Sequence, residues 1–300
     1  MTALASSAIT AADRPLGSAA APARSFVGGI AAFARREFRD AIASRWFLLY
    51  TVAFTVLAVG VSFLSLSGVG SHGFAGFGRT AAGLLNLIML VVPLMALTAG
   101  AGAIAGERER GTLIYLLAQP VSRTQLILGK YVGLATSLVC SLCIGFGVSA
   151  AVLAWRAGGV GITAFAMLVA FTAMLALAML SVGVLISVVS RRSAVATGIA
   201  LFVWLTLVFV SDLGLMASSI LFRLRVQEIF GLAIVNPMQS FKMAVIVNMN
   251  ASLDVLGPVG AYASFTLGRA LPWVLAATVA AWAVLPLALA TILFARRNSP

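Results

Sequence analysis

Charged residues are scarce in this chain: Asp, Glu, Lys and Arg make up 9% of its 300 residues, against about a quarter in an average soluble domain. Hydrophobic residues make up 62%, and the mean hydropathy is +1.09. A soluble fold needs a charged surface, which this composition cannot supply. A chain surrounded by lipid needs no such surface. The scarcity of charge therefore excludes a soluble globular domain and predicts a membrane-embedded protein.

Acidic residues, histidine and cysteine are rarer still, which narrows the possible chemistry. The chain has eight acids, one histidine and two cysteines. No apolar segment carries His, Asp, Glu or Ser clustered with catalytic spacing, so an enzyme is the least favoured class. Cys140 and Cys143 have C-x-x-C spacing inside a long apolar run without a second pair, and we expect them to pack a helix face rather than bind metal. His72, in a glycine-rich loop, is expected to face solvent.

Basic residues outnumber the acids, with 20 Lys and Arg and a net charge of +12. They do not form one patch with aromatic residues between them, so no nucleic-acid partner is expected. They stand at the ends of apolar segments, fourteen on one side of the predicted membrane and six on the other. The positive-inside rule then places both termini in the cytoplasm, as in a multi-pass protein of a bacterial inner membrane.

The apolar segments predict an all-α membrane protein with six transmembrane helices. A backbone in hydrocarbon must satisfy its own hydrogen bonds, and an α-helix needs about 20 residues to cross. Residues 1–25, rich in Ala and Ser, are expected to form a disordered cytoplasmic tail. The predicted transmembrane helices cover residues 46–66, 81–104, 125–155, 162–189, 194–221 and 272–294.

Two segments outside these spans predict helices beside the membrane. Over residues 26–45, apolar side chains share one helix side and arginines lie mainly elsewhere, which is typical of an amphipathic helix in the cytoplasmic interface. Within residues 221–271, Asn236 is suited to cap a helix that starts at Pro237. That helix is too short to cross, and we expect it to lie on the outer face or to dip into it.

The connection between the second and third spans, "GERERGTLIYLLAQPVSRTQ", concentrates the charge that the spans avoid. Its "GTLIYLLA" predicts one or two helical turns that end before Pro120. Ser122-x-x-Gln125 is a capping box, which predicts the start of the next span. The leucines of the short helix share a side. The segment is therefore either an interfacial turn or an element that offers an apolar face and fixed charges to a cytoplasmic partner.

This connection resembles the signature of bacterial ABC exporter permeases of the second class (ABC-type two). That signature is an acid, Gly-Thr-Leu, several leucines, a polar residue with Pro, Ser-Arg and then Gly-Lys, which here is Gly129-Lys130. The resemblance implies one permease domain over 26–300, with 26–45 as its elbow helix and the short helix as a coupling helix that inserts into a separate ATPase. The residues that would carry this role are Glu107, Glu109, Gly111, Thr112, Leu113, Leu116, Leu117, Pro120, Ser122 and Arg123.

The resemblance also implies an assembly. Two copies of this chain would form a homodimer that binds two copies of a cytoplasmic ABC ATPase. The chain contains no G-x-x-x-x-G-K-[ST], because "ILGKYVG" is too short and lacks the hydroxyl residue. ATP and Mg are therefore expected on the partner ATPase, and no cofactor is expected on this chain.

The last third of the chain carries a finer resemblance. Three segments, "LVFVSDLGLM", "VNPMQSFKMAVI" and "LDVLGPVGAYA", are similar to the permease of the copper-processing ABC system that serves maturation of nitrous oxide reductase. This implies a periplasmic partner at 221–270, with copper or a sulfur species as cargo, or mechanical work on that partner. An exporter of drugs, lipids or other small molecules is an alternative, as is an ATP-independent membrane scaffold or assembly factor.

Few residues are suited to a transport site. Asp212 is the only acid inside a predicted span, and intramembrane acids are functional candidates by default. Counted from residue 194 it lies ~27 Å along the helix, near the outer interface, where pairing with Arg223 or Arg225 is favoured. Thioethers suit Cu(I), but the three outer methionines do not share a helix face, so contact with the core or lipid is favoured for them. These methionines are Met238, Met243 and Met249.

Overall fold

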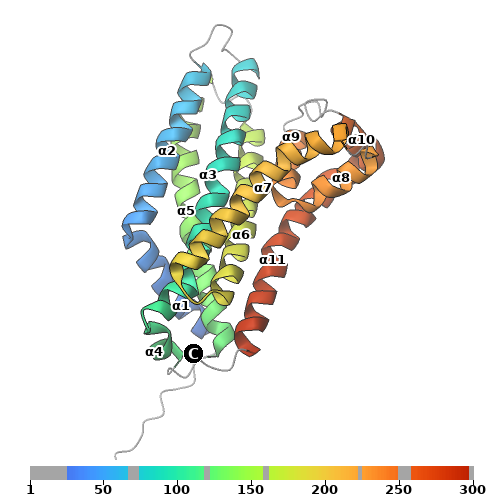
Figure 1. Ribbon diagram of the computed structural model, residues 1–300. Helices are drawn as coiled ribbons and strands as arrows, with labels where there is room; N and C mark the ends of the chain where they lie inside the picture. The colour runs from blue at the N-terminus through green and yellow to red at the C-terminus, as the bar shows by residue number, and fades with distance from the viewer. Residues whose placement is uncertain are drawn as a thin grey trace, which may run out of the picture.

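The computed structural model describes residues 26–66, 74–117, 122–157, 162–221, 225–248 and 258–296, and all regular structure in these ranges is helical. Long helices run side by side in a bundle, with two helices at one end, α1 (Phe26–Ala43) and α4 (Thr112–Leu117). Shorter helices gather at the opposite end (Figure 1). The predicted all-α class is confirmed, and the predicted tail, 1–25, lies outside the described residues.

Five helices are long and apolar enough to cross a membrane. They coincide with five of the predicted spans, and several extend beyond the predicted ends because helical structure continues past the apolar run into charged residues. They are α2 (Arg45–Leu66), α3 (Phe74–Glu109), α5 (Arg123–Ala157), α6 (Ile162–Val189) and α11 (Leu271–Arg296).

The sixth crossing has two possible forms in the described part of the chain. Helix α7 (Ser193–Leu221) coincides with the predicted fifth span, but its apolar part with described side chains, Ser193–Phe209, is shorter than a full crossing. Helices α8 (Val226–Val235) and α9 (Pro237–Asn248) together are apolar enough, but they meet at 103°. A crossing by α7 therefore stays a prediction, beside the five helices that are long and apolar enough to cross.

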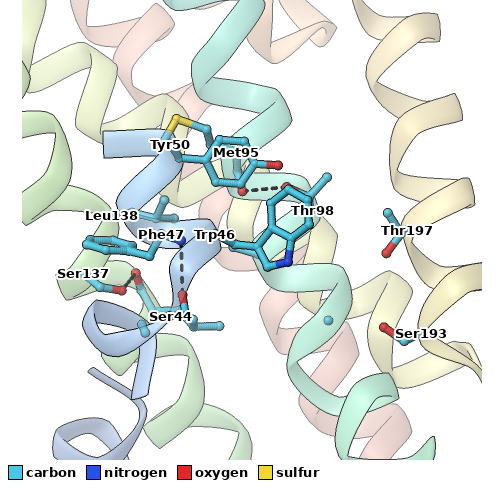
Figure 2. A pocket seen from close by; sticks show the side chains of 14 residues that line it. Ser44, Trp46, Phe47, Tyr50, Met95, Thr98, Ser137, Leu138, Ser193 and Thr197 are labelled. Carbon is cyan, nitrogen blue, oxygen red and sulfur yellow. Dashed lines mark hydrogen bonds between the residues drawn. The ribbon is translucent and has the colours of Figure 1, made fainter. Parts of the chain in front are cut away.

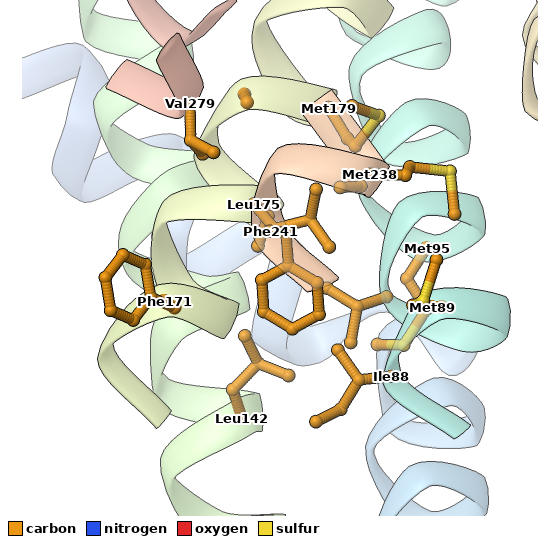
Figure 3. Close-up of a cluster of buried hydrophobic side chains, with 14 of the residues drawn as sticks. Ile88, Met89, Met95, Leu142, Phe171, Leu175, Met179, Met238, Phe241 and Val279 are labelled. Carbon is orange, nitrogen blue, oxygen red and sulfur yellow. The ribbon is translucent and has the colours of Figure 1, made fainter. Parts of the chain in front are cut away.

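Helix α9 begins at Pro237, as the sequence predicts. The backbone N–H of Met238 donates to the Asn236 side-chain oxygen at 3.0 Å, so Asn236 caps the helix. Nine of the twelve residues of α9 are buried, and Figure 3 shows Met238 and Phe241 among core side chains of neighbouring helices. Helix α10 (Pro258–Leu267) and a short 3-10 helix, Gly268–Ala270, lead into α11.

Glycines lie at several close helix crossings. Where α3 meets α6, a Cβ on Gly183 would lie 2.5 Å from the carbonyl oxygen of Leu97, and one on Gly100 would lie 2.7 Å from the carbonyl oxygen of Leu180. Small residues at such positions let backbones approach in the absence of a hydrophobic driving force between helices in lipid. The same device joins α1 to α5, since a Cβ on Gly133 would lie 2.6 Å from the carbonyl oxygen of Ala34.

Candidate functional site

The short helix of the charged connection is present and begins directly after α3. Helix α3 ends at Glu109, and Gly111 has a φ of +72°, the left-handed conformation that commonly stops a helix. The N–H of Gly111 donates to the Arg108 carbonyl at 3.1 Å, and the Thr112 hydroxyl donates to the Glu107 carbonyl at 3.2 Å. These two hydrogen bonds restrain the turn, so α4 is held in place at the end of α3.

The predicted capping box is present and stabilises the start of α5. The Ser122 N–H donates to the Gln125 side-chain oxygen at 2.8 Å, and the Gln125 N–H donates to the Ser122 hydroxyl at 3.2 Å. The Gln125 amide also donates to the carbonyl of Phe26 on α1 at 3.2 Å. Arg123 reaches the carbonyl of Phe294 on α11 at 3.5 Å. Pro120, which was expected to end the short helix, lies outside the described residues.

The leucines of α4 face inward, which corrects the expectation that they form an exposed apolar face. Leu113 and Leu116 are buried in a cluster with core residues that include Phe33 and Ile127. Because the Gly111 turn folds α4 back on the bundle, its apolar side packs against the neighbouring helices. The exposed apolar and aromatic side chains are Ile114 and Tyr115, at 57% and 78%. The side chain of Leu117 is outside the described part.

A buried ion-pair network joins three helices behind α4. Lys130 on α5 has its Nζ 2.7 Å from Glu37 Oε2 on α1 and 2.8 Å from Glu107 Oε1 on α3. The Lys130 side chain is 4% exposed, and the Glu107 side chain is 13% exposed. Charges withdrawn from water to this degree are stable only when their partners are well placed. Glu107 is therefore engaged inside the protein, which corrects its expected role as a charge offered to a partner.

The next two charges of the "ERER" run also hold neighbouring helices. A guanidinium nitrogen of Arg108 donates to the backbone carbonyls of Val188 and Ser190 at the end of α6. Glu109 accepts a hydrogen bond from the N–H of Ser193 at 3.0 Å, at the first residue of α7. A carboxylate there complements the positive end of the helix dipole. The charge cluster thus connects α3 to α5, α6 and α7.

No local pattern in the sequence pairs Lys130 with an acid. Lys130 stands in the Gly129-Lys130 motif, and Glu37 lies in the amphipathic segment 26–45. The available signal was a cation inside a predicted span, because such a charge must find a counter-ion when the surrounding helices exclude water. The partners stand 93 and 23 residues away along the chain, so spacing rules cannot identify them.

A cavity of about 500 Å³ lies between α2, α3, α5 and α7, and Ala41 of α1 also lines it. Figure 2 shows Trp46, Phe47 and Tyr50 of α2 near Met95 and Thr98 of α3, with residues of α7 on the far side. No charged side chain lines it. Its mostly apolar wall suits an uncharged or apolar ligand better than an ion. The hydroxyl groups in the wall belong to Ser44, Tyr50, Thr98, Ser137, Ser193 and Thr197.

The transport candidates are not gathered into one site in the described part of the chain. Met238 and Met243 are buried in the main apolar core (Figure 3). Met249 and the side chain of Asp212 lie outside the described residues. Cys140 and Cys143 are free thiols. No group of three or more His, Cys, Asp or Glu side chains suited to a metal ion occurs within the described ranges.

Comparison with known proteins gives a family match. Residues 31–299 match the family described as ABC-2 family transporter protein. The chain is 32% identical over 270 residues to "Probable ABC transporter permease protein NosY" of Stutzerimonas stutzeri, covering 88% of this chain and 97% of that protein. It is 31% identical over 270 residues, with the same coverage, to the protein of that name from Pseudomonas aeruginosa.

Proposed function

Because this chain belongs to the ABC-2 transporter family as a permease subunit, we propose that α4 receives force from a separate cytoplasmic ATPase and passes it to the membrane helices. The observation that carries the proposal is the division of α4 into two faces. Leu113 and Leu116 anchor it in the bundle, while Ile114 and Tyr115 stand free on its outer side. Exposed apolar and aromatic side chains on a short rigid helix suit insertion into a groove of a partner.

The surroundings of α4 support transmission of movement. The Gly111 turn joins α4 to α3, and the Lys130 network joins the end of α3 to α1 and α5. Arg108 and Glu109 extend the connection to α6 and α7. A displacement of α4 therefore acts on several membrane helices together rather than bending one loop.

The proposed assembly follows the family pattern. Two copies of this chain and two ATPase subunits form the complex, with ATP and Mg bound by the ATPases and no cofactor on this chain. The complex lies in an inner membrane with the α4 end and both termini in the cytoplasm, as the distribution of Lys and Arg supports. The helices between α7 and α11 then lie at the periplasmic end, and a periplasmic partner is proposed to bind within residues 221–270.

We expect the double change Ile114→Ala/Tyr115→Ala to weaken ATPase binding about 30-fold, as when a central hot-spot contact worth about 2 kcal/mol is lost. The measurement is the affinity of the purified chain for an ABC ATPase from its own gene neighbourhood. Because both side chains are exposed, the thermal stability of the chain in detergent should not change.

Phe265→Ala is the matched control, since Phe265 is 93% exposed on α10 at the opposite end of the bundle. It should leave ATPase affinity unchanged. Equal affinity of the α4 variant and the unmodified chain would refute docking through Ile114 and Tyr115. If the unmodified chain bound no ATPase, an ATP-independent scaffold would become the better explanation.

We propose copper or sulfur processing for nitrous oxide reductase as the physiological role. Support comes from the resemblance of the three segments in the last third of the chain and from the two permeases to which the chain is similar along most of its length. The burial of Met238 and Met243 in the apolar core favours a structural role for these thioethers. Movement of the outer helices against a partner is then as compatible with this role as passage of cargo.

Deletion of the gene is expected to abolish growth that depends on copper-containing nitrous oxide reductase, and the unmodified gene should restore it. The double change Met238→Leu/Met243→Leu should restore growth nearly as well, because volume-conserving core substitutions usually cost less than about 1.5 kcal/mol. Nitrous oxide reduction at the normal rate in the deletion strain would rule out this role.

An exporter of drugs, lipids or other small molecules is the second candidate function. The 500 Å³ cavity with its aromatic and hydroxyl wall favours it, because pockets of this size and character suit drug-sized ligands. Stimulation of the ATPase of the complex by such a compound, lost in Trp46→Ala, would support this candidate over copper processing.

A further inference from the structure

Helix α1 carries three different faces along its length. One face is packed against α5, with Gly29 and Phe33 buried and Glu37 paired with Lys130. A second face exposes apolar side chains, including Val27 and Ile42. A stripe of exposed guanidinium groups lies between these two faces. The groups are spaced three and four residues apart, so they share one side of the helix. We call Arg35, Arg36 and Arg39 the basic stripe.

The basic stripe surrounds a depression of about 180 Å³, lined by Ala32, Asp40 and the three arginines. Asp40 is the only acid in its wall and lies 3.7 Å from Arg36, in a pair that is more than half exposed. Three guanidiniums against one carboxylate leave two positive charges without compensation inside the depression. This volume is several times what one water molecule needs, so the depression has room for a phosphate group.

The position of α1 beside the membrane determines which molecules can reach this depression. Only Ser44 separates α1 from α2. The Ser44 hydroxyl accepts a hydrogen bond from the Phe47 N–H at 3.1 Å, which restrains the junction between the two helices. Helix α2 begins a membrane span, and its Trp46 is 70% exposed, as is typical of a side chain at the membrane–water interface. The exposed apolar face of α1 can therefore enter the lipid while the basic stripe beside it lies among the headgroups.

We propose that the basic stripe of α1 is a binding site for the headgroup of an anionic phospholipid. Guanidinium groups hold phosphate oxygens with paired hydrogen bonds as well as charge, which an ammonium group does less well. The apolar face of the same helix supplies contacts for the acyl chains of the bound lipid. The proposal goes beyond force transmission and does not depend on it, because neither the stripe nor the depression includes any residue of α4.

The test uses the full chain in phosphatidylcholine nanodiscs that contain a small fraction of phosphatidylglycerol, with bound phosphatidylglycerol counted by native mass spectrometry. The double change Arg35→Gln/Arg39→Gln should lower the affinity for phosphatidylglycerol about 30-fold, since each basic residue near an anionic surface contributes about a fivefold factor. Arg35→Lys/Arg39→Lys keeps the charge but not the paired hydrogen bonds, so its affinity should lie between those of the unmodified chain and the Gln variant. Both arginines are exposed, so the melting temperature of the variants in detergent should match that of the unmodified chain.

Arg191→Gln/Arg192→Gln is the matched control, because it removes the same charge from exposed residues in the connection between α6 and α7, at the same end of the bundle. It should change phosphatidylglycerol affinity less than threefold. Equal losses in the two Gln variants would reduce the effect to general surface charge and overturn the proposal, as would no loss in either. Unchanged lipid binding with reduced ATPase affinity in Arg35→Gln/Arg39→Gln would instead make the stripe a protein-docking surface.

Discussion

Replacing Lys130 with methionine is expected to be among the most damaging single changes in this protein, lowering its stability by about 3–5 kcal/mol. The reason is that Lys130 is the shared partner of Glu37 and Glu107, at 2.7 and 2.8 Å. Its loss leaves two poorly solvated carboxylates facing each other without a cation. The measurement is the midpoint of unfolding when sodium dodecyl sulfate is titrated into the chain in mild detergent.

Neutralising the whole network should reverse much of that damage. In the triple variant Glu37→Gln/Lys130→Met/Glu107→Gln no buried charge is left unpaired, and replacing a complete buried network is often nearly neutral. Arg36→Gln is the surface control, because the exposed Arg36–Asp40 pair should contribute little. If Lys130→Met unfolded at the same midpoint as Arg36→Gln, the network would not be a structural support of the α4 end.

The second large effect is expected at the crossing of α3 and α6. Gly183→Ala places a methyl group 2.5 Å from the carbonyl oxygen of Leu97 and 3.0 Å from the Cα of Gly100. These are backbone atoms, so no rotation of a side chain can relieve the clash and the two helices must separate. We expect a loss of about 1–3 kcal/mol for Gly183→Ala and a larger loss for Gly183→Val, measured in the same unfolding titration.

Gly102→Ala is the matched control on α3, because no atom lies within 4 Å of the added Cβ. Here alanine should leave stability unchanged or raise it by up to about 1 kcal/mol, since glycine in a helix interior is less favourable than alanine. Similar midpoints for Gly183→Ala and Gly102→Ala would show that the α3–α6 crossing is loose enough to accept a methyl group.

The sequence could predict the features that depend on neighbouring residues. Apolar length predicted five helices that the structure shows to be long enough to cross a membrane, because a helix in lipid must satisfy its hydrogen bonds within itself. The Ser122–Gln125 capping box and the Asn236 cap were also predictable, since each bond joins residues two or three apart. The start and end of these elements follow from local chemistry.

The direction in which side chains face could not be predicted in the same way. Leucines on one side of a short helix are equally consistent with a face that docks a partner and with a face packed inside the protein. Leu113 and Leu116 are packed inside the protein. The outcome depends on the fold-back at Gly111 and on the apolar cluster that receives the leucines. The exposed pair, Ile114 and Tyr115, is visible only once that packing is known.

The sequence by itself determined the helical class, five of the membrane spans and the isolation of one charged connection, because hydropathy and capping act over a few residues. Tertiary structure alone decided what that charge does. Glu37 and Lys130 are 93 residues apart, and Glu109 and Ser193 are 84 apart, yet each pair is in contact. A buried charge needs a partner, and only the fold brings that partner close. These charges therefore hold together the helices at the α4 end of the bundle.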